Sequence, residues 1–244
     1  LVPLPDHDFD LTEVAVPWHH LSSLGHEIVF ATEAGATPQV DPLLVRGVLF
    51  GQLGAEPEPK SFYAELEKDP RFQKPITWGA IDPASFDGLL LPGGHAPGMR
   101  QYLGSALLQE KVAAFWKLNR PVGAICHGVL VLARTIDPST GKSVLHASKT
   151  TCLPKYMERT AYFLTAWKLG NYYRTYPAYV EDEVKGALDS PETQFVRGPH
   201  ELTTRGTATD DRAAFVVEDS RYVSARWPGD AYLFAKKFQE RIEG

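Results

Sequence analysis

The feature that most constrains this 244-residue chain is a cysteine placed between two short apolar segments. Pro121–Ile125 is an apolar run that fits a buried strand, and Val129–Ala133 continues the apolar character into an expected helix. Cys126 therefore lies at a corner between a strand and a helix. Gly123 and Gly128 flank it, and small residues allow the sharp turn that such a corner needs.

A cysteine at such a corner projects its sulfur above the carboxyl edge of a sheet, where a nucleophile is accessible to substrate. The free N–H groups and dipole of the following helix favour a thiolate, so we expect Cys126 to have a depressed pKa and to be partly exposed. His127 beside it is the available acid or base. The alternative, a buried cysteine at a packed strand end, fits the Cys-His-Gly sequence less well.

A second segment points to the same edge of the sheet. Leu89–Leu91 is a predicted buried strand that ends in Pro92-Gly93-Gly94-His95. Backbone N–H groups at such a turn can form an oxyanion hole beside a nucleophile on a neighbouring strand. We assign Gly93, Gly94 and His95 to oxyanion or substrate binding, together with Trp227, which precedes the C-terminal helix.

Together, Leu-Leu-Leu-Pro-Gly-Gly-His and Ala-Ile-Cys-His-Gly resemble the DJ/ThiJ/PfpI superfamily over nearly the whole chain. The resemblance implies a flavodoxin-like α/β fold and an activity found among glyoxalase III-type enzymes, protease-like proteins, isocyanide hydratases and stress chaperones. It also implies a role for Glu13, because a family glutamate four residues before a proline contacts the nucleophilic sulfur, as in Glu13-Val-Ala-Val-Pro17. The alternative is a first-turn acid that stabilises the helix dipole.

The order of elements supports a doubly wound, mostly parallel sheet with helices on both faces. Leu1–Pro5 and Glu27–Thr32 are predicted strands on either side of a helix over 13–24, capped by Asp10 or Thr12. Further along the chain, we expect a helix that Ser105 caps, an extended segment over 143–153, a helix over 154–170, strands over 193–197 and 213–217, the latter in a hairpin with 222–226, and a C-terminal helix over 231–242.

We expect one domain over 1–244 rather than two independent cores. Two segments depart from a minimal doubly wound domain: 35–80, which is rich in proline, glycine and acids, and 154–190, which begins with a helical, aromatic run. We interpret both as insertions or cap elements. Their aromatic residues are more often packing than substrate contacts, but an insertion after Cys126 is placed to cover a pocket.

The proposed residue set suits a small reactive carbonyl. Cys126 would form a thiohemiacetal, and Glu13 would move a proton between substrate atoms through an enediolate. A backbone N–H at His127 and another at Gly94 would stabilise the oxyanion. The resemblance likewise indicates glyoxalase III-like conversion of methylglyoxal to lactate. This scheme requires no metal or other cofactor, and the adjacent His19-His20 pair lacks the spacing of metal ligands.

One expected partner of the histidine is absent from the sequence. Several members of the resembled family place a His or Asp after the next strand, but this chain has Lys149–Lys155 there with no such residue. Glu158, or an acid of 181–183, could substitute. Without an orienting group, strong peptidase activity is disfavoured, although a peptidase, amidase or hydratase remains an alternative. A class I glutamine amidotransferase is excluded because no His-x-Glu occurs.

Composition restricts the partners and the compartment. The net charge is −5 with no basic block, so neither nucleic acid nor an anionic membrane is indicated. Two cysteines argue against a disulfide framework and for a reducing, cytoplasmic environment, and no apolar run approaches the length of a membrane span. No signal peptide is visible, although the chain starts at Leu1. We expect a homodimer, and a redox-sensing stress chaperone is the non-enzymatic alternative.

Overall fold

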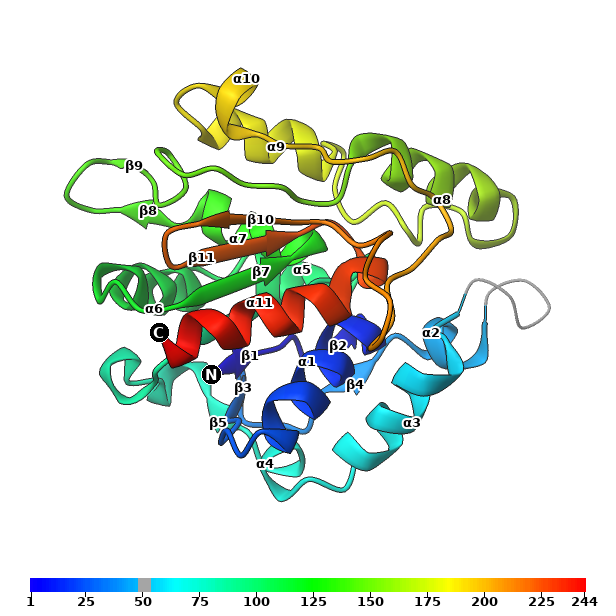
Figure 1. The fold of residues 1–244 in the computed structure, drawn as a ribbon, viewed down its shortest axis with the longest axis horizontal. Coiled ribbons are helices and arrows are strands. Elements are labelled where there is room, and N and C mark those ends of the chain that lie inside the picture. The colour runs from blue at the N-terminus through cyan, green and yellow to red at the C-terminus, as the bar shows by residue number, and fades with distance from the viewer. Residues whose placement is uncertain (48–53) are drawn as a thin grey trace.

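The computed structural model describes residues 1–47 and 54–244 and shows a central sheet between two layers of helices (Figure 1). Two groups of strands make up this main sheet, and the hydrogen bond from Leu90 N to Leu1 O (2.9 Å) joins them. Their order is β5-β3-β1-β6-β7-β11-β10. The bounds are β1 Val2–Pro3, β3 Phe30–Thr32, β5 Ile76–Thr77, β6 Leu89–Leu91, β7 Val122–Ile125, β10 Val216–Asp219 and β11 Tyr222–Ala225.

The strand pairs are parallel except at one edge, where β10 runs antiparallel to β11. The apolar β6 is buried along its length, as a central parallel strand covered on both faces must be. Leu91 pairs with Ala124, and Ala225 pairs with Ile125. The carboxyl ends of β6, β7 and β11 therefore lie at one edge of the sheet. The predicted α/β, doubly wound class is confirmed.

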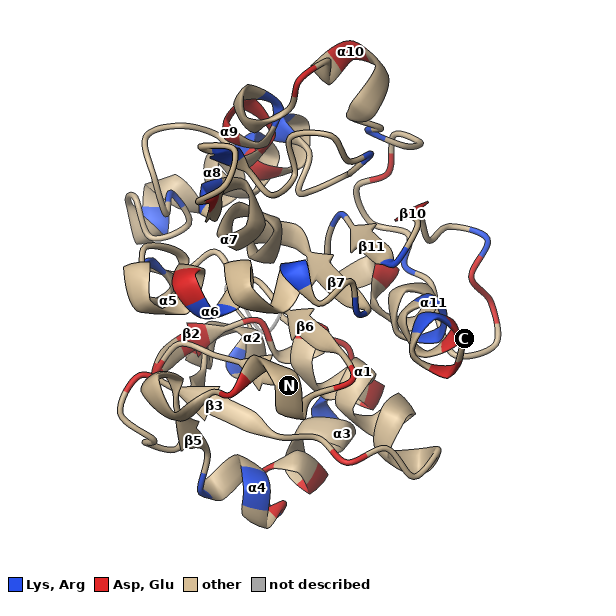
Figure 2. Cartoon of the chain, turned by 90° about the vertical axis from the view of Figure 1, so that its left-hand side faces the viewer, with Lys and Arg blue, Asp and Glu red and all other residues tan. Residues whose placement is uncertain are grey.

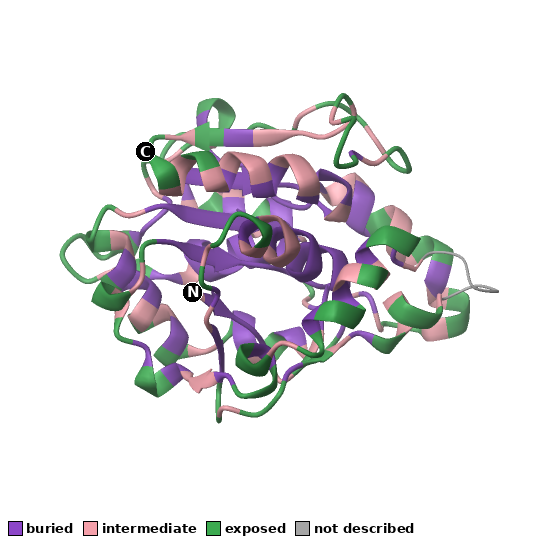
Figure 3. Cartoon of the chain, turned by 60° about the horizontal axis from the view of Figure 1, so that its bottom comes forward, coloured by how far each residue is buried: buried purple, intermediate pink, exposed green. Residues whose placement is uncertain are grey.

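Helices cover both faces of the main sheet (Figure 1). The helices α1 (Leu11–Ser23) and α11 (Ala231–Glu243) pack together on one face, while α5 (Met99–Leu103), α6 (Ala106–Lys117) and α7 (Val129–Arg134) lie on the other. Figure 3 shows that the central strands are buried, and along α11 buried positions alternate with partly exposed ones, the pattern of a helix with one apolar face.

Side-chain caps fix where two of these helices begin. The Asp10 carboxylate accepts hydrogen bonds from the backbone N–H groups of Thr12 (2.8 Å) and Glu13 (3.1 Å) at the start of α1. Ser105 accepts from Leu108 N (3.1 Å) at the start of α6. Each bond satisfies a donor that lacks an intrahelical partner. The caps that the sequence predicted are confirmed, with Asp10 rather than Thr12 capping α1.

The segment 35–80 contains elements beside the main sheet and one strand within it. β4 (Gln39–Val40) pairs in parallel with β2 (His7–Phe9), and β5 forms an edge of the main sheet. The predicted helical character around 60–68 corresponds to α3, although the helix begins earlier, behind a proline at its first turn. The helices of this segment are α2 Pro42–Arg46, α3 Pro57–Leu66 and α4 Pro70–Gln73, with short 3-10 turns at Trp78–Ala80 and Pro83–Ser85.

A second set of elements lies above the sheet edge that carries Cys126 (Figure 1). The predicted helix over 154–170 is confirmed as α8 (Lys155–Leu169), and α9 (Val180–Ala187) follows it. The segment 143–153 contributes to β9 (Lys142–Ser143), which pairs with β8 (Ile136–Asp137), and to a single bridge between Thr150 and Phe195.

The predicted strand over 193–197 is confirmed only in part. Phe195 forms a parallel bridge with Thr150, and Val196 N donates to Thr150 O (2.9 Å), whereas residues 191–194 form the short helix α10. Pro191 has a backbone torsion suited to the first helical position, and the Gln194 side chain accepts from Ser190 N (2.5 Å), so the local contacts favour a helical turn. The predicted C-terminal hairpin is confirmed as β10 and β11, although its first strand is Val216–Asp219 rather than 213–217 and its turn lies at Ser220-Arg221.

Charged residues of both signs are interspersed in the view of Figure 2. Within 1–47 and 54–244, no helix is long and apolar enough to cross a membrane.

Candidate active site

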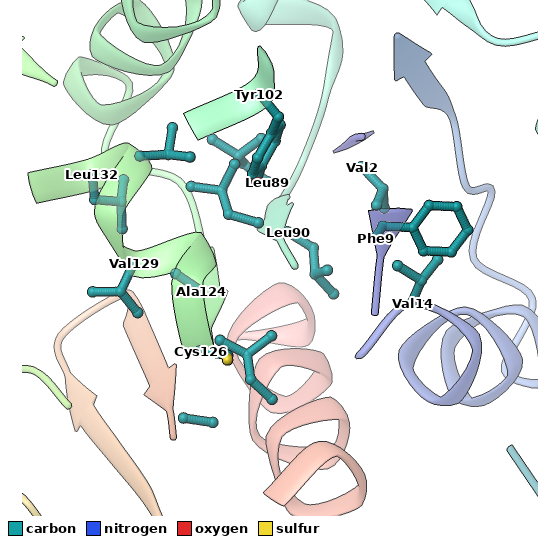
Figure 4. Close-up of a cluster of buried hydrophobic side chains, with 14 of the residues drawn as sticks. Val2, Phe9, Val14, Leu89, Leu90, Tyr102, Ala124, Cys126, Val129 and Leu132 are labelled. Carbon is teal, nitrogen blue, oxygen red and sulfur yellow. The ribbon is translucent and has the colours of Figure 1, made fainter. Parts of the chain in front are cut away.

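Cys126 occupies a strained corner at the end of β7. Its φ is +57°, a left-handed value that residues with a Cβ rarely adopt. A 3-10 turn, Cys126–Gly128, follows directly and leads into α7. Figure 4 shows its sulfur within the buried core of the sheet edge. Such strain costs about 1–3 kcal/mol and is found where it holds a functional side chain in place.

Two glycines allow the neighbouring backbones to meet at this corner. A Cβ on Gly128 would lie 2.1 Å from Leu91 O, so only glycine fits the contact between the turn and β6. A Cβ on Gly93 would lie 2.7 Å from His127 N and 3.0 Å from a Glu13 carboxyl oxygen. The two glycine motifs are therefore in direct contact, as expected for adjacent strands.

Glu13 lies in the first turn of α1 and is fully buried against the Cys126 thiol. Its Oε2 accepts a hydrogen bond from Gly93 N (2.7 Å). Burial raises the pKa of the Glu13 carboxyl well above its usual value, and the nearby Asp10 charge raises it further. This environment favours a protonated carboxyl, which can donate a hydrogen bond to the sulfur.

The pKa of Cys126 is raised rather than depressed, contrary to the expectation from its position. Burial is the largest cause, and the charges of Glu13 and Asp10 add to it, while the His127 N–H stabilises the thiolate only in part. The side chain is fully buried instead of partly exposed. The dipole of the turn at the corner is outweighed because desolvation penalises a buried anion strongly.

His127 turns its ring toward the sulfur although the two residues are adjacent in sequence. Its Nδ1 lies 3.6 Å from Cys126 Sγ, and its Nε2 lies 3.4 Å from Thr175 Oγ1. Thr175 Oγ1 in turn donates to His95 O (2.5 Å). Burial lowers the pKa of the His127 imidazole well below its usual value, which favours a neutral ring.

The acidic residues suggested as orienting groups for His127 have other partners. Glu158 accepts from Val180 N (3.0 Å) and pairs with Arg174 (3.4 Å). Glu181 pairs with Arg197 and accepts from Lys155 N (2.9 Å). This suggestion is therefore wrong. Glu158 of α8 bonds to the backbone of α9 and to Arg174, and Glu181 of α9 bonds to the backbone at the start of α8 and to Arg197. The hydroxyl of Thr175 occupies the place beside His127 Nε2.

Gly93, Gly94 and His95, which follow β6, each make a different contact at the site. The N–H of Gly93 is committed to Glu13 and is not free for an oxyanion, in contrast to its assignment from sequence. Gly94 has a φ of +156° and packs against Asp8 O. The His95 ring meets the His127 ring edge to face, 4.7 Å between centroids. Burial lowers the pKa of His95 to about 4, so it is neutral near pH 7.

A cavity of about 200 Å³ opens beside His95, whose ring contacts His127, and Cys126 is fully buried and does not line it. Met157 and Leu164 of α8 line one side, and Trp227 and Arg205 line another. The Arg205 guanidinium stacks 4.9 Å from the Trp227 ring centroid. Trp227 Nε1 and His95 Nε2 are buried and have no hydrogen-bond partner in the described part of the chain. These two nitrogens are free to bind a polar group in a mostly apolar cavity.

Sequence reasoning missed three residues of this site. Thr175 lies in the segment 154–190, which was interpreted from its aromatic residues as an insertion or cap element, and Arg205 lies in a loop without a motif. Asp10 was expected only as a helix cap, yet it also lines the cavity, and burial raises its pKa to about 6. No local sequence pattern identifies Thr175 or Arg205, because only the tertiary fold brings them to the site.

The arrangement combines a buried thiol, a neutral imidazole and a protonated carboxyl, with His95 between the imidazole and a mostly apolar cavity. Neutral groups of this kind suit an uncharged electrophile better than a charged one, because an ion would lose its hydration on entering. The thiol can add to an electrophilic carbon while the carboxyl and imidazole supply and accept protons.

The chain is similar to known proteins over most of its length. A family model described as ThiJ/PfpI family-like matches residues 4–199. A deglycase from Pyrococcus abyssi is 24% identical, over 96% of this chain and 94% of the relative. A deglycase from Pyrococcus horikoshii is 23% identical, over 98% and 97% respectively.

Solved structures show the same fold. A glyoxalase III from Candida albicans superposes with a TM-score of 0.71 at 20% identity, covering 98% of this chain and 96% of its own. At that identity the likeness concerns the arrangement of helices and strands.

Proposed function

Because this chain belongs to the ThiJ/PfpI family, we propose that it is a cysteine-dependent enzyme that converts small 2-oxoaldehydes to 2-hydroxy acids. Methylglyoxal, which would give lactate, is the substrate that we propose to test. The proposal draws on relatives named as deglycases and on a structural neighbour named glyoxalase III. It is also supported by the mostly apolar cavity beside His95, whose ring contacts His127.

The convergence of Cys126, Glu13 and His127 is the observation that carries the proposal. Glu13 lies against the thiol, and His127 Nδ1 lies 3.6 Å from the same sulfur. An aldehyde carbon bound to the sulfur would therefore have two proton-transfer groups within reach. Proton abstraction next to a carbonyl requires such a base at the carbon, and positioning one contributes typically 10²–10⁴-fold in rate.

The proposed reaction balances without an oxidant or a reductant. The Cys126 sulfur adds to the aldehyde carbon and the carbonyl oxygen takes up a proton, which gives a thiohemiacetal. Glu13 passes its own proton to the neutral His127 imidazole and then, as carboxylate, removes the hydrogen of that carbon, while His127 returns its proton to the enediolate oxygen. Glu13 then protonates the neighbouring carbon and takes up the hydroxyl proton of the sulfur-bound carbon, which leaves a thioester of the 2-hydroxy acid. Water then cleaves the thioester, releasing the acid and restoring the thiol.

The surroundings favour this sequence of steps. The raised pKa of Cys126 keeps the sulfur protonated in the resting enzyme, so its proton is available to the substrate oxygen as the bond forms. The raised pKa of Glu13 makes its carboxylate a stronger base than an exposed glutamate. The His127 N–H is near the sulfur and can donate to the developing oxyanion.

The test compares the two cysteines of the chain. Cys126→Ala should reduce methylglyoxal consumption by roughly 10³-fold or more, since loss of a nucleophile removes the whole pathway. Cys152→Ala is the matched control, because that thiol is also fully buried but lies away from Glu13. Lactate formed in D₂O should carry deuterium at carbon 2. Equal consumption by wild type and Cys126→Ala would exclude the proposal.

A stress chaperone is a second candidate, favoured by exposed apolar residues on α8. Phe163 and Trp167 are 65% and 73% exposed and lie one turn apart. Suppression of aggregation of a denatured client protein should be measured with wild type, Cys126→Ala and Phe163→Ser/Trp167→Ser. A holdase that depends on the two aromatics and lacks methylglyoxal turnover would replace the enzymatic proposal.

A further inference from the structure

Three ligand atoms of the kind that zinc prefers lie together at the site, and one of them belongs to His95, which also lines the cavity. One nitrogen each from His95 and His127 and the sulfur of Cys126 are all within 4.8 Å of one another. They come from the turn after β6 and the turn after β7, two backbones held in direct contact by Gly93 and Gly128. The position of these donors is therefore set by the main sheet rather than by a mobile loop.

The spacing between sulfur and nitrogen agrees with tetrahedral coordination. Zn–S bonds of about 2.3 Å and Zn–N bonds of about 2.0–2.1 Å place two ligand atoms of a tetrahedron about 3.5–3.6 Å apart. Cys126 Sγ and His127 Nδ1 are 3.6 Å apart. The ligand atom of His95 lies within 4.8 Å of the other two, so binding the same ion requires it to move closer to them.

The donor types also suit this ion, because imidazole nitrogen and cysteine sulfur are common ligands of zinc. His95 Nε2 is buried and has no hydrogen-bond partner within 1–47 and 54–244, so coordination would satisfy it. Glu13 Oε1 is likewise buried and unpartnered there, next to the thiol. A divalent cation would compensate the charges of a thiolate and a carboxylate that burial otherwise disfavours.

We propose that His95, Cys126 and His127 bind a borderline-soft divalent cation such as Zn²⁺, with Glu13 or a water at the fourth position. As the sulfur–metal bond forms, the S–H bond breaks and its proton passes to the buffer. The ion occupies the sulfur lone pair that would attack a substrate, so bound zinc inhibits any reaction that uses this thiol. Binding itself does not depend on the proposed oxoaldehyde chemistry, and only the inhibition does.

Co²⁺ titration of the Cys152→Ser protein tests the site directly. This variant retains one thiol, so a sulfur-to-cobalt charge-transfer band can arise only from Cys126. We expect one Co²⁺ per chain, visible d–d bands of tetrahedral intensity, and displacement of cobalt by an equivalent of Zn²⁺. Absence of the charge-transfer band, or binding confined to octahedral, weakly absorbing cobalt, would overturn the proposal.

Variants then identify the ligands. His95→Gln and His127→Gln should each weaken Zn²⁺ binding by at least about tenfold in calorimetry, and Cys126→Ser should abolish the charge-transfer band. His146→Gln is the matched control, because that histidine lies on the far side of α7 beside Lys142 and Asp189. Zinc binding that survives in Cys126→Ser and falls in His146→Gln would identify a surface site and refute the assignment.

Two readouts keep this inference separate from the proposed function. Thermal melts and circular dichroism report whether each variant folds, and the cobalt spectrum of the Cys152→Ser protein needs no change at the site. A protein that binds zinc but does not consume methylglyoxal would retain the metal site and lose the proposed function. A protein that turns over methylglyoxal unaffected by stoichiometric Zn²⁺ would retain the function and lose the metal site.

Discussion

The two cysteines of this chain are equally buried but occupy very different surroundings. Both side chains are fully shielded from solvent, and burial raises the pKa of each thiol. Cys126 is held at a φ of +57° with Glu13 and His127 against its sulfur. Cys152 precedes α8, and its sulfur lies 3.6 Å from Leu153 O.

The acids near the two thiols also differ. Glu13 has no cation of its own and keeps Oε1 unpaired within the described residues. Near Cys152, Glu158 and Glu181 are paired with Arg174 and Arg197. Burial alone therefore does not distinguish a reactive cysteine from a structural one. The difference lies in an unpaired proton-transfer group and a strained backbone that directs the sulfur toward it.

The largest expected effect concerns the two carboxyl groups. Glu13→Gln keeps the shape and the acceptor for Gly93 N but removes the ionisable proton. We expect kcat for methylglyoxal to fall by roughly 10²–10⁴-fold with a small change in KM. Glu158→Gln, near the other thiol, should retain kcat within a few-fold. Steady-state kinetics of both variants measure the effect. A larger loss of kcat in Glu158→Gln than in Glu13→Gln would contradict the distinction between the two thiol sites.

The backbone of the corner can be tested through Gly128. In Gly128→Ala, the new Cβ would meet Leu91 O at 2.1 Å, so either β6 or the turn must move. We expect a loss of about 3 kcal/mol in the free energy of unfolding, together with loss of turnover. Urea denaturation measures the first quantity.

Gly186 in α9 is the control for that substitution. A Cβ there would meet nothing within 4 Å, and alanine suits a helix better than glycine. Gly186→Ala should stabilise the protein by about 0.5–1 kcal/mol. Equal stability of the two variants would show that the corner relaxes freely, and the argument from close packing would fail.

The pH dependence of the free energy of unfolding should report the titration of Glu158, which lies near Cys152. Burial raises the pKa of Glu158 to about 7 from 4.5. The folded state therefore holds this proton more tightly than the unfolded chain. The contribution of Glu158 is fully present below about pH 4.5 and is lost as pH rises through about 7.

The difference between the two pKa values bounds the effect at about 3 kcal/mol, and we expect roughly 2 kcal/mol because Arg174 lies beside the carboxylate. Urea denaturation of wild type and Glu158→Gln from pH 5 to pH 8 measures it. The stability difference between the two proteins should shift in favour of the variant as pH rises. A constant difference across that range would show that Glu158 does not titrate there.

The smallest expected effect concerns Thr175, which lies beside His127 Nε2. Thr175→Val removes a hydroxyl that donates to His95 O and lies 3.4 Å from the imidazole. A lost hydrogen bond of this kind costs about 1 kcal/mol, so we expect a roughly fivefold lower kcat with KM nearly unchanged. Thr175→Ser should restore most of the activity. Failure of serine to rescue would assign the residue a packing role instead.

Local sequence determined the elements that meet at the site. The apolar runs before Gly93 and Cys126 could form only buried strands, and parallel strands end at the same sheet edge. Asp10 and Glu13 follow a helix-start pattern, which places the carboxyl of Glu13 at that edge. The contact between Glu13 and Cys126 was thus predictable, although its support came partly from a family resemblance.

Tertiary structure alone decided the electrostatics and the remaining partners. The helix-dipole argument predicted a depressed pKa for Cys126, but burial in the packed fold raises it, and the charges that add to this effect belong to Glu13 and Asp10, which lie more than 100 residues away in the sequence. Thr175 and Arg205 reach the site from positions without any periodic or motif signal. Desolvation and side-chain pairing are properties of the packed chain, because they depend on which distant segments exclude water from a site, and a local pattern contains no information about that.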